Sequence, residues 1–266
     1  MRQTGKVNAV NAFDSSAAPN TDIAHQPHIS LVIPAYNEAA HLPALLDSVE
    51  VARQHYRRGA HTVEVIVGNN ASTDDTANIA LARGCRVAHV TERRIACARN
   101  GGAALARGTI IAFIDGDSRI HPNTFNVIEE HLTERVVVGA TSIDPERWSW
   151  GIRATWLLAT IMTWFMRIDA GVVFCRRADF ETIGGYDESL DYAEDVQFLI
   201  DLKRLGKPRG QKFFRADMAK AITSVRKFDK FGHWHYFTHM PRVAFWMVIN
   251  RSRAHDFTQR YWYKDR

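Results

Sequence analysis

The sequence predicts an α/β fold in which a mainly parallel sheet is covered by helices. Short β-type runs alternate with helix-type periodicity from Ile29 to Ile114, as in chains of strand–helix units. The apolar run at 110–114 fits a strand buried on both faces. With 266 residues, 46% of them hydrophobic, the chain can bury a full core. We expect one main domain with appendages.

The expected elements follow from local patterns. Runs of β-favouring residues between turn residues predict strands at 29–33, 63–67, 86–90, 110–114 and 136–141. Helical periodicity predicts helices after Asn37, which we expect to act as an N-cap, through Ile79 and Leu81, after Pro122, and from about Tyr192 to Leu205. Gly184 and Gly185 predict a turn before the last of these helices. Four of the expected strands thus direct the loops at their carboxyl ends to one edge of the sheet.

The two ends of the chain differ from the middle in composition. Residues 1–28 are rich in Ala, Asn, Ser and Asp, and we expect a disordered lead-in. The main domain is expected at 29–227, followed at 228–266 by a helical segment rich in aromatic and basic residues. No stretch reaches about 18 uninterrupted apolar residues, so a membrane-spanning helix is not expected.

Charge and cysteine content narrow the class of protein. Lys and Arg exceed Asp and Glu by 34 − 29 = 5, an excess that suits phosphate ligands or an anionic membrane surface and does not require nucleic acid. The three cysteines are widely separated and show no metal-type pairing. We therefore expect a reduced, cytoplasmic setting.

Two carboxylates, Asp115 and Asp117, directly follow the buried run at 110–114. The carboxyl edge of an open α/β sheet is where ligands bind. Two neighbouring carboxylates repel each other unless a positive group lies between them, and a divalent metal carrying a diphosphate is the usual solution. The alternative is an Asp-Gly turn in which Asp117 caps the next helix.

Several segments, in this order, resemble the family 2 glycosyltransferases. The resembling segments are Val-Ile-Pro-Ala-Tyr-Asn-Glu at 32–38, Asn-Asn-Ala-Ser-Thr-Asp at 69–74, Ala-Arg-Asn at 98–100, Asp-Gly-Asp at 115–117, Gly-Gly-Tyr-Asp-Glu at 184–188 and Glu-Asp at 194–195. Each motif alone is weak, whereas their common order over residues 29–205 is specific. The resemblance implies the GT-A fold, with a Rossmann-like mixed sheet flanked by helices and, at the C-terminus, amphipathic helices.

The resemblance also implies roles for individual residues. A divalent ion, Mn²⁺ or Mg²⁺, would be held by Asp117 directly, with Asp115 nearer the ribose or reaching the ion through water. The implied contacts to a nucleotide-diphosphate sugar come from Pro34, Tyr36, Glu38, Asn69, Arg99 and Asp115. Asp195, with Glu194 before it, would be the base of a single, inverting displacement. Structural alternatives are a helix-dipole role for Glu38, a solvated surface position for Arg99 and a capping role for Asp195.

Asn69 departs from the family pattern, in which an Asp usually contacts the base at this position. Asp accepts a hydrogen bond from the uracil imide, and Asn can accept through its oxygen and also donate. A UDP-sugar is therefore expected first, and guanosine and thymidine donors stay open.

Two aromatic segments suggest where the acceptor binds. Trp148 to Phe165 combines tryptophans and aliphatic residues with Arg153, a pattern for a helix lying in a membrane interface, and the chain beyond Lys227 is similarly aromatic. We expect a glycan or lipid-linked acceptor and a peripheral membrane contact, with buried helices or an oligomer interface as the alternative. Either His233 or His235 is a possible third metal ligand. Arg226 and Lys227 could hold the diphosphate or form a surface basic pair.

Rival functions are an inactive nucleotide-sugar-binding or scaffold protein, a sugar-phosphate nucleotidyltransferase, and a nucleic-acid binder. The nucleotidyltransferase usually places a Gly-rich basic loop after the first strand, where this chain has Pro-Ala-Tyr-Asn-Glu. The nucleic-acid binder lacks a recognisable module. The sequence predicts neither the sugar, the linkage nor the oligomeric state.

Overall fold

The computed structural model describes residues 26–166, 169, 171–190, 193–234 and 237. The expected lead-in up to residue 25 and most of the segment 228–266 lie outside these residues. The strands are β1 (Ile29–Ala35), β2 (Val63–Asn70), β3 (Arg86–Val90), β4 (Ile110–Phe113), β5 (Ser118–Arg119), β6 (Val136–Pro145), β7 (Val173–Arg176) and β8 (Lys212–Thr223). The helices are α1 (Leu42–His55), α2 (Thr76–Ala82), α3 (Ile95–Ala104), α4 (Thr124–His131), α5 (Trp150–Met166), α6 (Arg177–Ile183), α7 (Glu194–Gly206) and α8 (Arg226–Phe231), with short 3₁₀ turns at Ala60–Thr62 and Lys207–Arg209.

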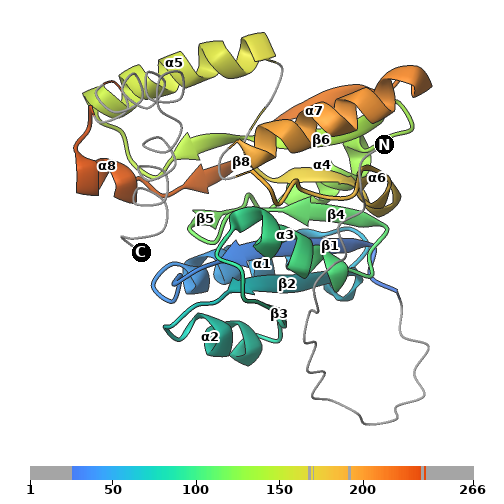
Figure 1. Ribbon diagram of the computed structural model, residues 1–266, viewed down its shortest axis with the longest axis horizontal. Coiled ribbons are helices and arrows are strands. Elements are labelled where there is room, and N and C mark those ends of the chain that lie inside the picture. The colour runs from blue at the N-terminus through green and yellow to red at the C-terminus, as the bar shows by residue number, and fades with distance from the viewer. Residues whose placement is uncertain (1–25, 167–168, 170, 191–192, 235–236, 238–266) are drawn as a thin grey trace.

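One mixed sheet runs through the molecule in the order β3-β2-β1-β4-β7-β6-β8-β5 (Figure 1). Strands β1 to β4 are parallel, as predicted from the alternation of strands and helices. Strand β7 is antiparallel to both β4 and β6, and β8 is parallel to β6 with a bulge between Thr141 and Ile143. The strand direction therefore reverses at β7, which lies directly beside β4, the strand that precedes Asp115.

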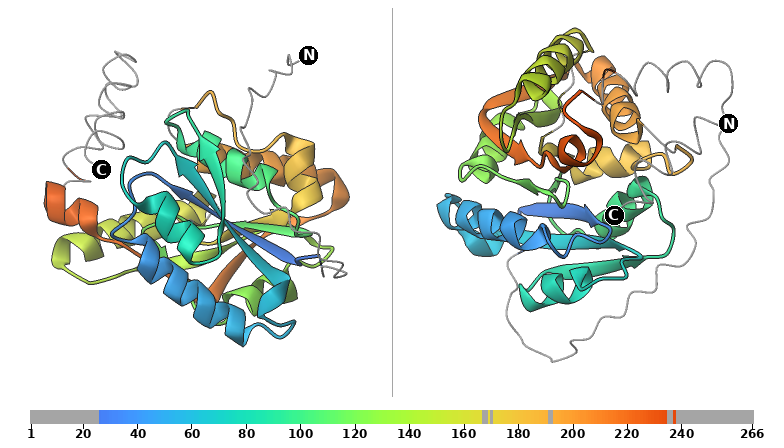
Figure 2. Two further views of the ribbon diagram at one scale, coloured as in Figure 1. Left: turned by 90° about the horizontal axis from the view of Figure 1, so that it is seen from below. Right: turned by 90° about the vertical axis from the view of Figure 1, so that its left-hand side faces the viewer.

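Helices cover both faces of the sheet (Figure 2), and apolar side chains fill a layer on each face. One layer packs α1 and α4 on the sheet through residues such as Leu45 and Phe125, and the other packs α3, α6 and α7 through residues such as Phe198. Leu42, Leu45, Leu46 and Val49 of α1 are buried against the sheet. A smaller apolar cluster joins α5 to α8 at one end of the molecule. The three cysteines are buried and unpaired.

The prediction that Asn37 caps the first helix is wrong. Helix α1 begins at Leu42, its N-cap residue is His41, and Asn37 has a φ of 51°. Asn tolerates this left-handed conformation better than most residues. Its Oδ1 accepts a hydrogen bond from the backbone N–H of Thr73, 2.8 Å away, so Asn37 ties the β1–α1 loop to the β2–α2 loop.

Candidate active site

The carboxyl ends of β1, β2 and β4 bring most of the expected donor-binding residues to one edge. Pro34 and Ala35 of β1 pair with Gly68 and Asn69 of β2, while Val32 pairs with Phe113 of β4. A Cβ on Gly116 would lie 3.4 Å from the carbonyl oxygen of Pro34 and 3.2 Å from Glu38 Cγ. The Asp-Gly-Asp turn therefore contacts the β1–α1 loop.

Asp115 and Asp117 have the chemistry of a divalent-metal site. Asp115 Oδ1 lies 3.1 Å from Arg99 Nη2, and Asp117 Oδ2 lies 2.9 Å from Arg226 Nη2. The other oxygen of each carboxylate has no partner among the described residues and is a hard ligand of the kind that Mg²⁺ and Mn²⁺ take. The alternative that Asp117 caps a helix is excluded, because the next element is β5 and α4 has Asn123 at its N-cap.

A metal ion here would also need ligands from outside the protein. Within the described part of the chain, no three His, Cys, Asp or Glu side chains are grouped to hold a metal. Two carboxylates completed by water and substrate phosphates are a common arrangement for Mg²⁺. Of the two histidines considered as a third ligand, His233 is hydrogen-bonded to the hydroxyl of Ser149 (2.9 Å) just before α5, and His235 lies outside the described residues.

Glu38 is held by an arginine from the other end of the domain. Its carboxylate, only 2% exposed, accepts two hydrogen bonds from Arg226 of α8, from Nη1 (2.9 Å) and Nη2 (2.8 Å). Glu38 is not in the first turn of α1, so the helix-dipole alternative does not apply. Burial lowers the pKa of Arg226, but the hydrogen bonds and charges of Glu38 and Asp117 outweigh it and raise the pKa above its ordinary value.

Arg99 links the Asp-Gly-Asp turn to helix α7. Its Nη1 donates to Glu194 Oε1 at 2.8 Å, its Nη2 donates to Asp115 Oδ1, and its guanidinium lies 5.0 Å from the centre of the Tyr186 ring. Helix α3 can bring Arg99 here because Gly68 has no side chain: a Cβ there would lie 2.1 Å from the carbonyl oxygen of Ala98. The surface alternative for Arg99 is thereby excluded, since the residue is 8% exposed.

Glu194 and Asp195 begin α7 but lie in different environments. Glu194 is buried against Arg99, and desolvation raises the pKa of its carboxyl, with Arg99 acting in the opposite direction. Asp195 is half-buried, and its Oδ1 accepts a hydrogen bond from its neighbour Val196 N, while Oδ2 has no partner among the described residues. The N-cap position belongs to Ala193, in the left-handed conformation with φ 56°. Asp195 is therefore a first-turn residue and not the N-cap of α7.

Polar and aromatic groups flank the other side of the carboxylates, where a nucleotide base is expected. Tyr36 is 8% exposed and its ring centre lies 4.9 Å from the guanidinium carbon of Arg93. Asn69 Oδ1 accepts a hydrogen bond from the N–H of Ser72, so this side chain also shapes its own loop. Asn70 is buried, and its Oδ1 has no partner among the described residues.

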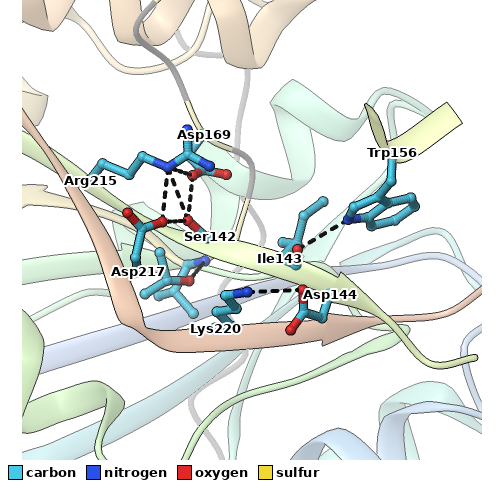
Figure 3. Close-up of polar contacts among 10 residues, drawn as sticks. Ser142, Ile143, Asp144, Trp156, Asp169, Arg215, Asp217 and Lys220 are labelled. Carbon is cyan, nitrogen blue, oxygen red and sulfur yellow. Dashed lines mark hydrogen bonds and ion pairs between the residues drawn. The ribbon is translucent and has the colours of Figure 1, made fainter. Parts of the chain in front are cut away.

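A second polar cluster fixes the connection between α5 and β7. Figure 3 shows Arg215 of β8 facing Ser142, Asp169 and Asp217; its Nε lies 2.9 Å from Asp169 and 3.0 Å from Asp217. Ser142 Oγ donates to Asp169 at 2.8 Å. Asp169 precedes β7, whose Val173 pairs with Phe113 of β4. The cluster therefore holds the chain that enters the sheet beside the Asp-Gly-Asp turn.

The sequence did not assign Arg226, Tyr186 or Arg93 to the site. The sequence leaves two roles for Arg226, because its partner Glu38 is 188 residues away and the strand β8 that precedes it is not predicted. Arg226 lies three residues after the end of β8, the same placement after a strand as that of the other site residues. Tyr186 belongs to a predicted turn, and its contact with Arg99 depends on packing between α3 and α7.

Solved structures show that this architecture is the GT-A fold. A mannosyltransferase from Pyrobaculum calidifontis in complex with GDP-Man and Mn²⁺ superposes with a TM-score of 0.59 at 19% identity, over 79% of this chain and 63% of that chain. Glucosyl-3-phosphoglycerate synthase from Mycobacterium tuberculosis, with Mn²⁺, UDP and phosphoglyceric acid, superposes with a TM-score of 0.56 at 23% identity, over 79% and 75%. These similarities show the fold.

Residues 30–199 match the family described as glycosyl transferase family 2, and the chain belongs to this family. A PGL/p-HBAD biosynthesis glycosyltransferase of Mycobacterium bovis is 30% identical over 186 residues, which cover 65% of this chain and 69% of that protein. A dolichyl-phosphate beta-glucosyltransferase of Trichomonas vaginalis is 27% identical over 46% of this chain. The match covers 42% of that relative's own length.

Proposed function

We propose that this protein is a metal-dependent, inverting glycosyltransferase that moves a sugar from a nucleotide-diphosphate donor to a hydroxyl acceptor. The observation that carries the proposal is the Arg99 bridge, which joins Asp115 to Glu194. It ties the Asp-Gly-Asp turn, which carries the carboxylates suited to a metal–diphosphate, to the first turn of α7, which carries Asp195, the carboxylate suited to a base. A scaffold protein without catalytic activity would not need both a metal–diphosphate site and a base.

On the donor side, Asp117 and Asp115 would hold a Mn²⁺ or Mg²⁺ ion, whose chemistry there is to neutralise the charge of the leaving diphosphate. Tyr36 and Asn69 lie where the base is expected, at the ends of β1 and β2. We infer a UDP-sugar first, because an Asn at position 69 can still accept from a uracil imide. The two structural neighbours described above are complexes with Mn²⁺, one with UDP and the other with GDP-Man.

On the acceptor side, Asp195 removes the proton of the attacking hydroxyl through Oδ2, which has no partner among the described residues. A carboxylate suits this step because the hydroxyl becomes acidic only as its bond to the sugar forms. Glu194 and Arg99 act as positioning residues: their ion pair fixes the first turn of α7 and so the direction of Asp195. The charge on Glu194 is compensated by Arg99, which leaves Asp195 as the base.

The acceptor is a glycan or a lipid-linked molecule, and the protein contacts the inner face of a membrane. Helix α5 supports this, because Trp150, Leu157, Leu158 and Ile161 are exposed on it. Arg153 lies against the exposed rings of Trp148 and Trp150. Such a face suits the interface of an anionic bilayer. No helix of the described residues is long and apolar enough to cross a membrane.

Asp195→Asn tests the assignment of the base. Asn keeps the size of the side chain but cannot take a proton, so donor binding should change less than about twofold while turnover falls by at least about a hundredfold. The measurement is nucleotide-diphosphate release from the sugar donor, alongside calorimetric binding of the same donor. Near-normal turnover in this variant would mean that the base is another residue.

Asp201→Asn is the matched control. Asp201 lies on the same helix, two turns further on, and hydrogen-bonds Gln197 and Arg204 at the surface. The same chemical change there should leave donor binding and turnover as in the unmodified protein. Equal losses in the two variants would indicate a general effect on α7.

A further inference from the structure

In the proposed donor site, the positively charged side chain of Arg226 contacts Asp117, the carboxylate that is expected to bind the metal. Arg226 makes its double contact with Glu38 and, through Nη2, also lies 2.9 Å from Asp117 Oδ2. The three side chains are all largely buried, with 25%, 2% and 15% of the Arg226, Glu38 and Asp117 side chains exposed. Charges this poorly solvated interact strongly, because water screens them little.

Arg226 is held at this position by the packing of its helix. It is the first residue of α8, and the neighbouring Val225 and Phe228 are buried in a cluster with Ile152 of α5. Helix α8 therefore holds the guanidinium of Arg226 at the site through its first residue, and its buried side chains contact the aromatic helix α5 (Figure 1).

We propose that Arg226 is an internal counter-ion that competes with the divalent cation for Asp117 and turns to the donor diphosphate when metal and nucleotide bind together. A cation that approaches Asp117 alone meets the positive charge of Arg226 and must displace it or bear the repulsion. A diphosphate offers the guanidinium a new anionic partner with the same fork geometry. Metal and nucleotide should consequently strengthen each other's binding, because binding linkage is reciprocal.

This inference rests on the proposed function, but one part of its test does not need a nucleotide. Arg226→Gln removes the charge and retains a side chain that can hydrogen-bond Glu38. We expect this variant to bind Mn²⁺ alone at least about tenfold more tightly than the unmodified protein. We also expect the factor by which UDP strengthens Mn²⁺ binding to fall by at least about tenfold, both measured by titration calorimetry.

Two further variants separate the role of Arg226 from general effects. Lys230→Gln removes one positive charge from the same helix at an exposed position, and its Mn²⁺ affinity should equal that of the unmodified protein. Arg226→Lys keeps the charge and should retain weak binding of Mn²⁺ alone. Unfolding curves of all variants verify that the domain is intact.

The titrations distinguish the counter-ion role of Arg226 from the proposed function and from an effect of overall charge. If Arg226→Gln binds Mn²⁺ alone no more tightly than the unmodified protein and Lys230→Gln do, the counter-ion role is wrong. It is also wrong if none of these three proteins binds Mn²⁺ measurably. If Mn²⁺ binding behaves as expected but UDP, GDP and dTDP all fail to bind, the competition stands and the proposed function fails. If Lys230→Gln shows the same gain as Arg226→Gln, the effect is one of overall charge and the inference is overturned.

Discussion

Asp74 holds the β1–α1 and β2–α2 loops together although it lies outside the expected site. Its carboxylate accepts hydrogen bonds from the backbone N–H of Ala39 and from the N–H and hydroxyl of Thr76. Thr76 Oγ1 in turn accepts a hydrogen bond from Glu38 N at 2.9 Å. The position of the buried Glu38 therefore depends on an exposed side chain of the next loop.

Asp74→Asn should lower stability in a pH-dependent way. Desolvation opposes ionisation of Asp74, but hydrogen bonds from Thr76 and Ala39 outweigh it and lower its pKa below the ordinary value. This stabilisation is fully present above the unfolded pKa near 3.9 and is lost as the pH falls through the folded pKa. We expect a loss of about 1 kcal/mol at pH 7, less below pH 4, from urea unfolding curves. A difference that stays constant with pH would contradict this explanation.

At the level of single residues, the sequence predicted which carboxylates lie at this edge of the sheet better than it predicted their partners. Asp115, Asp117 and Asp195 directly follow strands or begin helices, so local pattern and resemblance together located them. The pairing of Glu38 with Arg226 joins residues 188 apart and depends on how β8 and α8 fold back. No local pattern encodes such a contact.

Helix α5 is the element whose role depends most on its surroundings. One side packs Ile152 and the partly buried Trp156 against α8, and Trp156 Nε1 donates a hydrogen bond to Ile143 O. The other side leaves Trp150, 83% exposed, and Leu157, 65% exposed, without packing partners in the described core. An exposed apolar side of this kind marks a site of contact with another surface.

The double variant Trp150→Ser with Leu157→Ser should weaken binding to anionic lipid vesicles by at least about tenfold. Each large apolar side chain contributes about 1.5–3 kcal/mol when it is fully buried. Vesicle co-sedimentation measures the effect. Leu81→Ser, on α2 and 55% exposed, is the control and should bind as the unmodified protein does. If the unmodified protein does not bind vesicles, α5 contacts something other than a membrane.

Among the elements, those with a clear apolar period were predicted and those with mixed patterns were missed. Strand β3 lies at its predicted bounds, and β6 extends four residues beyond the prediction. Strand β8 has intermediate and exposed residues over most of its length, with a bulge in its pairing to β6, so it lacks a strict alternation. Strand β7 was not predicted because it is only four residues long and follows an apolar, aromatic segment from which its pattern does not stand apart.

For the molecule as a whole, the reversal of strand direction at β7 joins the half of the sheet that carries Asp115 and Asp117 to the half against which α7 and Asp195 lie. The parallel strands β1 to β4 carry the carboxylates, and α7 beyond the reversal carries Asp195. An aromatic cluster of Phe113, Tyr186 and Phe198 packs β4 against α7, with the Tyr186 and Phe198 rings stacked at 4.0 Å. The parallel half was predictable from sequence, whereas the strand order of the second half is set by long-range pairing.

The central claim is that this edge of the sheet binds a nucleotide diphosphate together with a divalent metal. Calorimetric titration of the unmodified protein and of Asp117→Ala with UDP, GDP and dTDP, each with and without Mn²⁺, tests it most directly. We expect one nucleotide, UDP first, to bind in the presence of Mn²⁺ and this binding to be lost in Asp117→Ala. Failure of every nucleotide to bind the unmodified protein, or equal binding by Asp117→Ala, would contradict the account.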